Sequence, residues 1–190
     1  GFSPTAGIFW RGTILYAAER GTGVLYRIQT GPVSAKAFTT GAPAILVPPI
    51  VQSTSSGANL YVAPEDKFVW KLHSDNMVAT GASGPADPWG SLGRSADLSS
   101  TTTTSPWTTV GPKGDDTSMV FVGVNNQFYG LTGTEGSTDW SVAVTGSPQG
   151  EPVMFRGWFY FGTDSGWLYK IWHADGSNAI RLTNNDARDF

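Results

Sequence analysis

Two histidines, each followed closely by an aspartate, are the residues with the most evident capacity for chemistry. His73 precedes Asp75, and His173 precedes Asp175. Imidazole and carboxylate groups are ligands for Zn²⁺ and similar ions. The runs His-Ser-Asp and His-Ala-Asp-Gly are also ordinary turn sequences, and the two pairs lie far apart in the chain. We therefore expect turns at both places and no metal site.

The other acidic clusters match neither a calcium loop nor a catalytic motif. Asp115-Asp116 and the run Asn184-Asn-Asp-Ala-Arg-Asp189 offer oxygen ligands, but neither has the spaced carboxylates and turning glycine of an EF-hand. The sequence contains no GxSxG, HExxH, P-loop or Rossmann fingerprint. We expect no catalytic residue, no cofactor-binding residue and no enzymatic activity.

Trp89 and Trp107 stand apart from the other tryptophans because they lie in or beside a loop rich in Ser, Thr, Gly and Pro. An exposed tryptophan on a flexible arm often anchors an interface, so these two are candidate protein-contact residues. Stacking on a sugar is the alternative role. Five others fall within expected strands, where burial is expected: Trp10, Trp140, Trp158, Trp167 and Trp172.

The composition indicates a folded chain without covalent crosslinks. Of the 190 residues, 39% are hydrophobic and 13% aromatic, which excludes disorder, and the lack of cysteine excludes disulfides and cysteine–metal sites. The net charge of -3, without a basic run, makes nucleic acid an unexpected partner. The longest apolar stretch, Ala42 to Val51, contains three prolines and is shorter than the roughly 20 residues of a membrane helix.

Short aromatic and β-branched runs bounded by turn residues recur along the whole chain and predict an all-β fold. One hairpin pattern repeats four times, with an aromatic residue in its second strand. The second and fourth copies keep one spacing, the first has two more residues in its turn, and the third has one fewer. Each copy has a further strand upstream and downstream, including one expected near Met77 to Thr80. Four strands per repeat of roughly 40–50 residues are typical of a β-propeller blade. The aligned aromatics are Tyr26, Trp70, Tyr129 and Tyr169.

The repeats divide one domain, residues 1-190, into approximate blades at 1-42, 43-82, 106-146 and 147-190. Residues 83-105 form an insertion rich in Ser, Thr, Gly and Pro. Because this composition has little to bury, we expect a long flexible loop there. We expect the whole arm from Gly81 to Pro106, together with the unclosed blade faces, to contact partner subunits.

The third repeat, Tyr129-Gly-Leu-Thr-Gly-Thr-Glu-Gly-Ser-Thr-Asp-Trp140, resembles the blade motif of the PQQ-like (quinoprotein dehydrogenase-like) propellers. Thr132 and Glu135 depart from that motif. The hairpin around Trp158 to Tyr169 is similar to the same family. The resemblance implies that Trp140 docks onto the next blade, and it gives Tyr26, Trp70, Tyr129 and Tyr169 structural roles in blade packing. Propellers of this kind serve as dehydrogenases, scaffolds, adhesins and sensors, so the resemblance implies a fold more than a function.

Four blades leave the closure of the ring open. The chain could close as a four-bladed ring, two chains could complete an eight-bladed ring, or the chain could be a portion of a longer polypeptide or assembly. An unclosed arc would expose sheet edges and apolar surface.

These observations lead us to expect a non-catalytic scaffold or interaction subunit of a larger assembly, or a self-associating chain. The abundance of Ser, Thr, Gly and Trp and the lack of cysteine favour an extracytoplasmic place, in the periplasm, at the cell surface or secreted. A glycan- or receptor-binding surface module is the alternative. A fragment of a PQQ-dependent dehydrogenase is the third reading, but we expect no cofactor because the blade aspartate is replaced at Thr132.

Overall fold

The computed structural model describes residues 4–19, 22–31, 34–40, 45, 47–54, 57–74, 93–100, 102–104, 106–110, 118–133 and 136–182. Its strands form four antiparallel sheets, and each sheet is built from strands that follow one another in the chain. The prediction of an all-β chain with four repeats is confirmed.

Each sheet is named here by its order in the chain. Sheet 1 contains β1 (Pro4–Arg11), β2 (Ile14–Glu19), β3 (Val24–Gln29) and β4 (Ser34–Thr39). Sheet 2 contains β5 (Ile50–Thr54), β6 (Gly57–Val62) and β7 (Trp70–His73). Sheet 3 contains β8 (Trp107–Val110), β9 (Ser118–Val124), β10 (Gln127–Thr132) and β11 (Thr138–Ala143). Sheet 4 contains β12 (Pro148–Phe155), β13 (Trp158–Thr163), β14 (Leu168–Trp172) and β15 (Ile180–Leu182).

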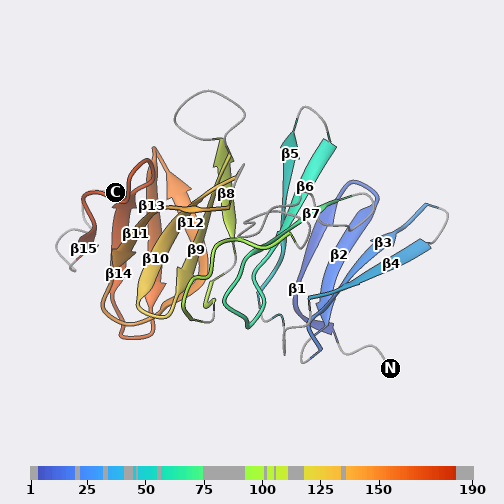
Figure 1. Cartoon of the computed structure of the whole chain (residues 1–190), viewed down its shortest axis with the longest axis horizontal. Coiled ribbons are helices and arrows are strands. Elements are labelled where there is room, and N and C mark those ends of the chain that lie inside the picture. The colour runs from blue at the N-terminus through green and yellow to red at the C-terminus, as the bar shows by residue number, and fades with distance from the viewer. Residues whose placement is uncertain are drawn as a thin grey trace.

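The four sheets stand side by side as an open arc, with sheet 1 at one end of the long axis and sheet 4 at the other (Figure 1). The first strands of neighbouring sheets approach one another, as β1 does with β5 and β5 with β8. The hairpins β1–β2, β9–β10 and β12–β13 have turns of two residues. Asn125 and Gly157 sit in such turns at positive φ, a conformation that asparagine and glycine adopt most readily.

A buried apolar cluster fills each space between neighbouring sheets. Sheets 1 and 2 enclose a cluster around Tyr16, Leu25 and Leu60. Sheets 2 and 3 enclose one around Tyr61, Val122 and Leu131. In the described part of the chain, none of these clusters contains residues from both sheet 1 and sheet 4. The closed four-bladed ring is therefore not the arrangement of this structure.

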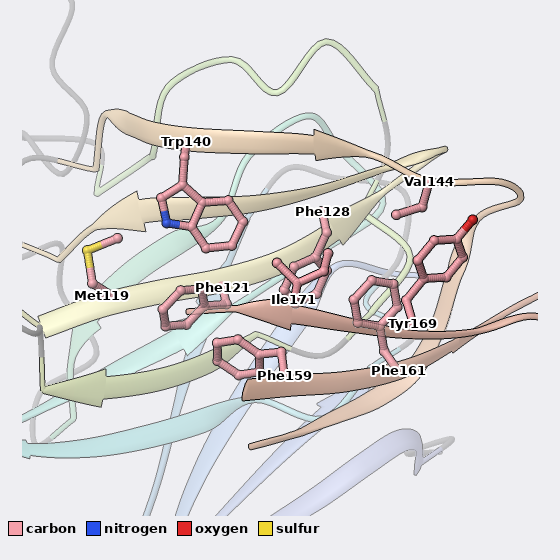
Figure 2. Close-up of a cluster of buried hydrophobic side chains, with 9 residues drawn as sticks. All are labelled: Met119, Phe121, Phe128, Trp140, Val144, Phe159, Phe161, Tyr169 and Ile171. Carbon is pink, nitrogen blue, oxygen red and sulfur yellow. The ribbon is translucent and has the colours of Figure 1, made fainter. Parts of the chain in front are cut away.

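The cluster between sheets 3 and 4 is the most aromatic (Figure 2). Phe128 of sheet 3 stacks on Phe161 of sheet 4 with ring centroids 4.4 Å apart. Phe121 and Phe159 make a second contact across the same space, at 4.3 Å. Trp140 closes one end of the cluster, since its indole lies above Phe121 and Phe128.

The described part of the predicted flexible insertion is packed against the sheets. Leu98 is buried in the cluster between sheets 2 and 3, and it carries the segment around it into the core. The Thr102 hydroxyl donates to the Pro64 carbonyl at 2.6 Å, and the Thr104 hydroxyl accepts from the Gly123 amide at 2.7 Å. The expectation of a flexible loop is thus wrong for residues 93–100 and 102–104, because serine and threonine hydroxyls satisfy backbone groups there.

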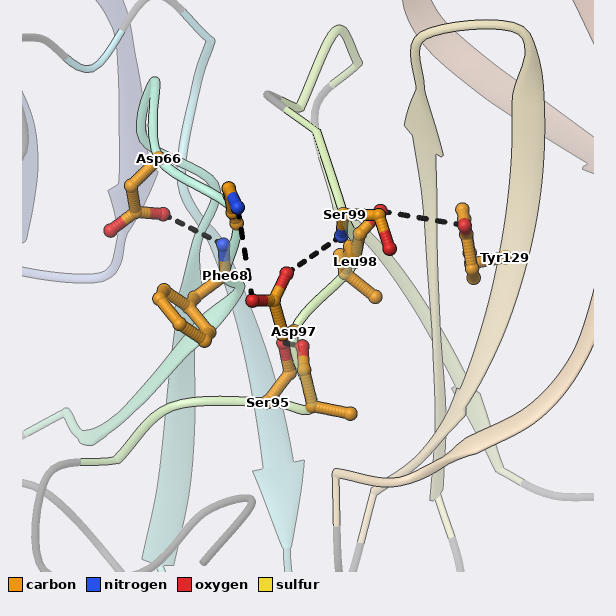
Figure 3. A network of polar contacts seen from close by, with 9 residues as sticks. Asp66, Phe68, Ser95, Asp97, Leu98, Ser99 and Tyr129 are labelled. Carbon is orange, nitrogen blue, oxygen red and sulfur yellow. Dashed lines mark hydrogen bonds and ion pairs between the residues drawn. The ribbon is translucent and has the colours of Figure 1, made fainter. Parts of the chain in front are cut away.

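Polar contacts also tie this segment to both neighbouring sheets (Figure 3). Tyr129 of sheet 3 donates its hydroxyl to the Leu98 carbonyl at 3.4 Å. On the other side, Ser95 accepts a hydrogen bond from the Val69 amide at 3.0 Å. The segment therefore lies between sheets 2 and 3 and is hydrogen-bonded to both.

The segment also provides an outer pairing partner for sheet 2. Arg94 forms an antiparallel bridge with Trp70, flanked by hydrogen bonds from the Lys71 amide to Gly93 and from the Ser95 amide to Val69. The downstream strand expected near Met77 to Thr80 lies outside the described residues. The pairing partner on the outer side of β7 is thus Arg94, which lies beyond residue 82, the predicted end of this blade.

Removal of the central ring of the aromatic cluster tests this packing. We expect Phe128→Ala to lower the free energy of unfolding by about 3–5 kcal/mol, because it deletes a fully buried ring and leaves a cavity. Asp139→Ala on the exposed side of β11 is the control, with a change within about 0.5 kcal/mol. Urea denaturation measures both, and equal losses would contradict the assigned core.

Candidate protein-docking faces

Sheet 4 has one face that no other part of the described chain covers, called here the outward face of sheet 4. The strand register places Val153 beside Tyr160, Phe155 beside Trp158, and Trp158 beside Trp172, all on this face. Val153 and Phe155 are 61% and 55% exposed. The face continues through Leu168, Lys170 and Ile180.

Sheet 1 has a corresponding outward face at the other end of the arc. Ile8 lies opposite Ala17, and Trp10 lies opposite Leu15, on the side turned away from sheet 2. Ile8 and Trp10 are 60% and 57% exposed. Two ends of one chain therefore present apolar sheet faces of the kind that are buried between sheets elsewhere in the molecule.

A tyrosine and a basic residue face each other across the second and third strands of three sheets. This repeated arrangement is called here the Tyr–basic pair. The register gives it directly. In sheets 1 and 2 the pair lies on the face turned toward the next sheet of the chain, and in sheet 4 it lies on the outward face. Its members are Tyr16 with Arg27 in sheet 1, Tyr61 with Lys71 in sheet 2, and Tyr160 with Lys170 in sheet 4.

In sheets 1 and 2 the basic residue of the pair bonds to the following sheet. Arg27 Nε donates to the carbonyl of Ser74, just after β7, at 3.0 Å. The Tyr16 hydroxyl donates to the same oxygen at 3.0 Å. Lys71 Nζ donates to the carbonyl of Gly133, just after β10, at 2.6 Å. Both basic side chains are buried, so each bond satisfies a charged group in the space between two sheets.

Sheet 3 fills the same position differently. Phe121 lies opposite Gly130 there, and the ring of Trp140 occupies the space above this glycine, where a Cβ atom would collide with it. The ring also lies against Gly176, in the loop between β14 and β15 of sheet 4, where a Cβ would meet it at 2.6 Å. Trp140 thus lies between sheets 3 and 4 with a glycine from each in contact.

Three of the four aligned repeat aromatics lie on the opposite face of their sheets, turned toward the preceding sheet. Trp70 and Tyr169 are buried in the clusters that join their sheets to sheets 1 and 3. Tyr129 packs against the cluster between sheets 2 and 3. Tyr26 lies on the outward face of sheet 1, half-buried, with its hydroxyl donating to Glu19 at 3.2 Å. In the first repeat, therefore, the aromatic residue that packs against the preceding sheet in the other repeats lies on the outward face.

The predicted contact residues Trp89 and Trp107 have different outcomes. Trp89 lies outside the described residues. Trp107 belongs to β8 of sheet 3, and its ring meets Phe159 edge-on at 6.1 Å, so it is a packing residue and not part of an exposed arm. The expectation of burial fails for Trp10, and Trp158 and Trp172 are only half-buried, because their sheet faces have no neighbour in the described chain.

The two histidines lie at different sheets and do not come together. His73 lies in sheet 2 and His173 follows β14 of sheet 4, while Asp75 falls outside the described residues. Asp175 accepts a hydrogen bond from the Ser177 amide at 2.8 Å, as in an ordinary turn. Among the described residues, no three histidine, aspartate or glutamate side chains gather closely enough to hold a metal ion.

The Tyr–basic pair is the feature that sequence reasoning missed. Its signal was present, because a basic residue directly follows three of the four repeat aromatics, at Arg27, Lys71 and Lys170. The hairpin register is what reveals the opposing tyrosine and the side of the sheet that both residues share.

Lys71 offers a direct test of the bond between sheets. Burial lowers the pKa of its ammonium group, so the bond to Gly133 must offset a desolvation cost. We expect Lys71→Ala to lower the free energy of unfolding by about 1–3 kcal/mol, since it leaves the Gly133 carbonyl without this partner. Lys36→Ala, on exposed β4, should change it by less than about 0.5 kcal/mol. A neutral result for Lys71→Ala in urea denaturation would show that the bond adds nothing.

His173 should make stability fall in mild acid. Burial lowers its pKa below 6.5, against the weaker opposing charge of Asp175. The unfolded chain therefore takes up the proton first, so stability present above pH 6.5 is lost as the pH falls through the lowered pKa. Denaturation between pH 7.5 and 5 measures this slope. His173→Gln should reduce it, and an unchanged slope would assign the effect to other groups.

The arrangement is similar to solved β-propellers. BamB from Moraxella catarrhalis aligns with a TM-score of 0.58 and 14% identity, over 90% of this chain and 49% of that chain. A chain of the mitotic checkpoint complex aligns with a TM-score of 0.61 and 10% identity, over 93% of this chain and 50% of that chain.

A third similar structure, the computationally designed Ika4 protein, has a TM-score of 0.55 and 9% identity, over 88% of this chain and 89% of that chain. No family model matches the sequence, and no curated protein matches it. The chain spans about half the length of the first two structures, and the predicted β-propeller fold is confirmed. The likeness to the PQQ-like repeats remains a resemblance in sequence.

Proposed function

We propose that this chain is a non-catalytic scaffold or interaction subunit of a larger protein assembly, and that it binds through the outward faces at the two ends of its arc. The observation that carries the proposal is the exposure of Val153, Phe155, Ile8 and Trp10 on sheet faces whose equivalents are buried between sheets. Full burial of one such side chain contributes about 1.5–3 kcal/mol, so covering several on one face can drive association.

The chemistry of the faces favours protein over glycan. On the outward face of sheet 4, the Lys170 ammonium lies 4.2 Å from the ring centroid of Trp158, and Trp158 meets Trp172 edge-on at 5.1 Å. Phe155 and Val153 extend this surface with exposed apolar side chains, and Arg156 Cζ lies 5.2 Å from the ring centroid of Phe155. A sheet from a partner protein covers such a broad apolar face, whereas a sugar would cover one or two rings, so we place the glycan- or receptor-binding role second.

One comparison supports the assignment as far as architecture goes. One similar structure is a chain of the mitotic checkpoint complex, so a related arc of blades occurs within a protein assembly. In the described part of the chain, no helix has the length and apolar character needed to cross a membrane. The extracytoplasmic location is part of the proposal and rests on composition, chiefly the lack of cysteine.

A charge placed on the outward face of sheet 4 tests the proposed function. In extracts of cells that make the protein, we expect the tagged chain in a species heavier than its own 20.2 kDa, and Phe155→Asp should shift it to a lower mass because a buried charge opposes docking. Ser141→Asp, on exposed β11, is the matched control and should leave the mass unchanged. Size-exclusion chromatography with light scattering measures each species. A wild-type chain found only at 20.2 kDa would contradict the proposal.

A further inference from the structure

We infer that the outward face of sheet 4 docks onto the outward face of sheet 1 of a second copy of this chain, with Lys170 donating a hydrogen bond to the carbonyl of Thr30 in that copy. The inference rests on the proposed function and names its partner. It follows from a hydrogen bond that recurs between neighbouring sheets, in which a basic residue of one sheet donates to a backbone carbonyl of the next. Sheet 4 carries such a basic residue, and sheet 1 carries such a carbonyl, on faces that adjoin no other sheet of the described chain.

The donor side of this contact is set by the Tyr–basic pair. In sheets 1 and 2 the pair is buried, with Tyr16 and Tyr61 at 1% and 0% exposure and Arg27 and Lys71 at 7% and 9%. In sheet 4 the same pair, Tyr160 and Lys170, is only half-buried. The difference arises because sheets 1 and 2 are each followed by another sheet, whereas β15 is the last strand of the described chain.

The acceptor side is set by a fixed spacing from the repeat aromatic. The acceptor Ser74 lies four residues after Trp70 (74 − 70), and the acceptor Gly133 lies four residues after Tyr129 (133 − 129). The same offset from Tyr26 leads to Thr30 in sheet 1 (30 − 26). Thr30 is exposed and directly follows β3, and its amide and hydroxyl both donate to the Thr13 carbonyl, which fixes the turn that contains Thr30.

The two faces are of complementary type. Sheet 4 presents the kind of face that sheets 1 and 2 turn toward their successors, and sheet 1 presents the kind that sheets 2 and 3 turn toward their predecessors. Tyr26, Ile8 and Trp10 occupy the receiving face. Sheet 4 of one copy can therefore follow sheet 1 of another in the order that the chain already uses internally.

Length and symmetry favour two copies. This chain matches 49% of one solved propeller and 50% of another, so a second set of four sheets would account for the remaining length. Two arcs joined head to tail around a two-fold axis form a closed ring with two identical junctions, which leaves no outward face uncovered.

The first test is the mass of the purified chain, followed by the effect of Lys170. We expect a dimer at twice 20.2 kDa. Lys170→Ala should raise the dimer dissociation constant at least about tenfold, because a hydrogen bond from a charged group is lost at each junction. Lys170→Arg should stay close to the wild type, since Arg27 makes the equivalent bond in sheet 1. A monomeric wild type, or equal weakening by alanine and arginine, would overturn the inference.

A crosslink tests the named contact independently, because the chain contains no cysteine. We expect the double variant Thr30→Cys with Lys170→Cys to form a covalent dimer with a short bismaleimide, whose length replaces the missing lysine side chain. The two sites lie at opposite ends of one arc, so the crosslink must join two copies (Figure 1). Thr30→Cys with Asp139→Cys on exposed β11 is the control, and equal crosslinking of both variants would overturn the inference.

These results separate the inference from the proposed function. The chain could be monomeric when pure but heavier in cell extracts, with the heavier species lost in Phe155→Asp. That result would contradict docking onto a second copy of the chain but support the proposed interaction function. Further blades of a longer polypeptide or a different protein would then cover the faces. A chain at 20.2 kDa under both conditions would overturn both proposals.

Discussion

The two-sidedness of the β-sheet governs this structure. A strand points successive side chains to opposite faces, and in this chain both faces of each sheet carry apolar residues. Each sheet therefore needs a neighbour on either side. The buried clusters between sheets meet this need within the arc, but they do so only where two sheets of the chain adjoin. The outward faces of sheets 1 and 4 carry the same pattern, but their apolar residues stay exposed because no sheet of the described chain covers them.

Polar groups between the sheets follow the same logic. Arg27 and Lys71 carry charges into buried spaces, where an unpaired charge would be costly, and each bonds to a backbone carbonyl of the following sheet. Such a bond has a defined length and direction, so it aligns one sheet on the next more closely than apolar contact alone. Between sheets 3 and 4 the same position contains no charge, and the flat ring of Trp140 between Gly130 and Gly176 sets the spacing instead.

The insertion shows how composition can mislead. Its serines and threonines predicted a loop with little to bury, yet Leu98 is almost fully buried and the Thr102 and Thr104 hydroxyls bond to the backbone of neighbouring segments. Short hydroxyl side chains are polar in solution but become core residues when a carbonyl or amide lies within reach. Their partners, Pro64 and Gly123, lie far from them in the sequence, so no local pattern could reveal the contact.

The sequence by itself determined the strands, the hairpins and the fourfold repeat, because these depend on turn residues and on alternation along a few neighbouring positions. It also marked the repeat aromatics and the basic residue that follows three of them. Only the tertiary structure decided which side of each sheet those residues occupy, and hence that Tyr26 and Lys170 lie on outward faces while Lys71 and Trp70 are buried. The physical reason is that burial depends on whether another sheet stands alongside, which is a property of the assembled arc and not of any single repeat.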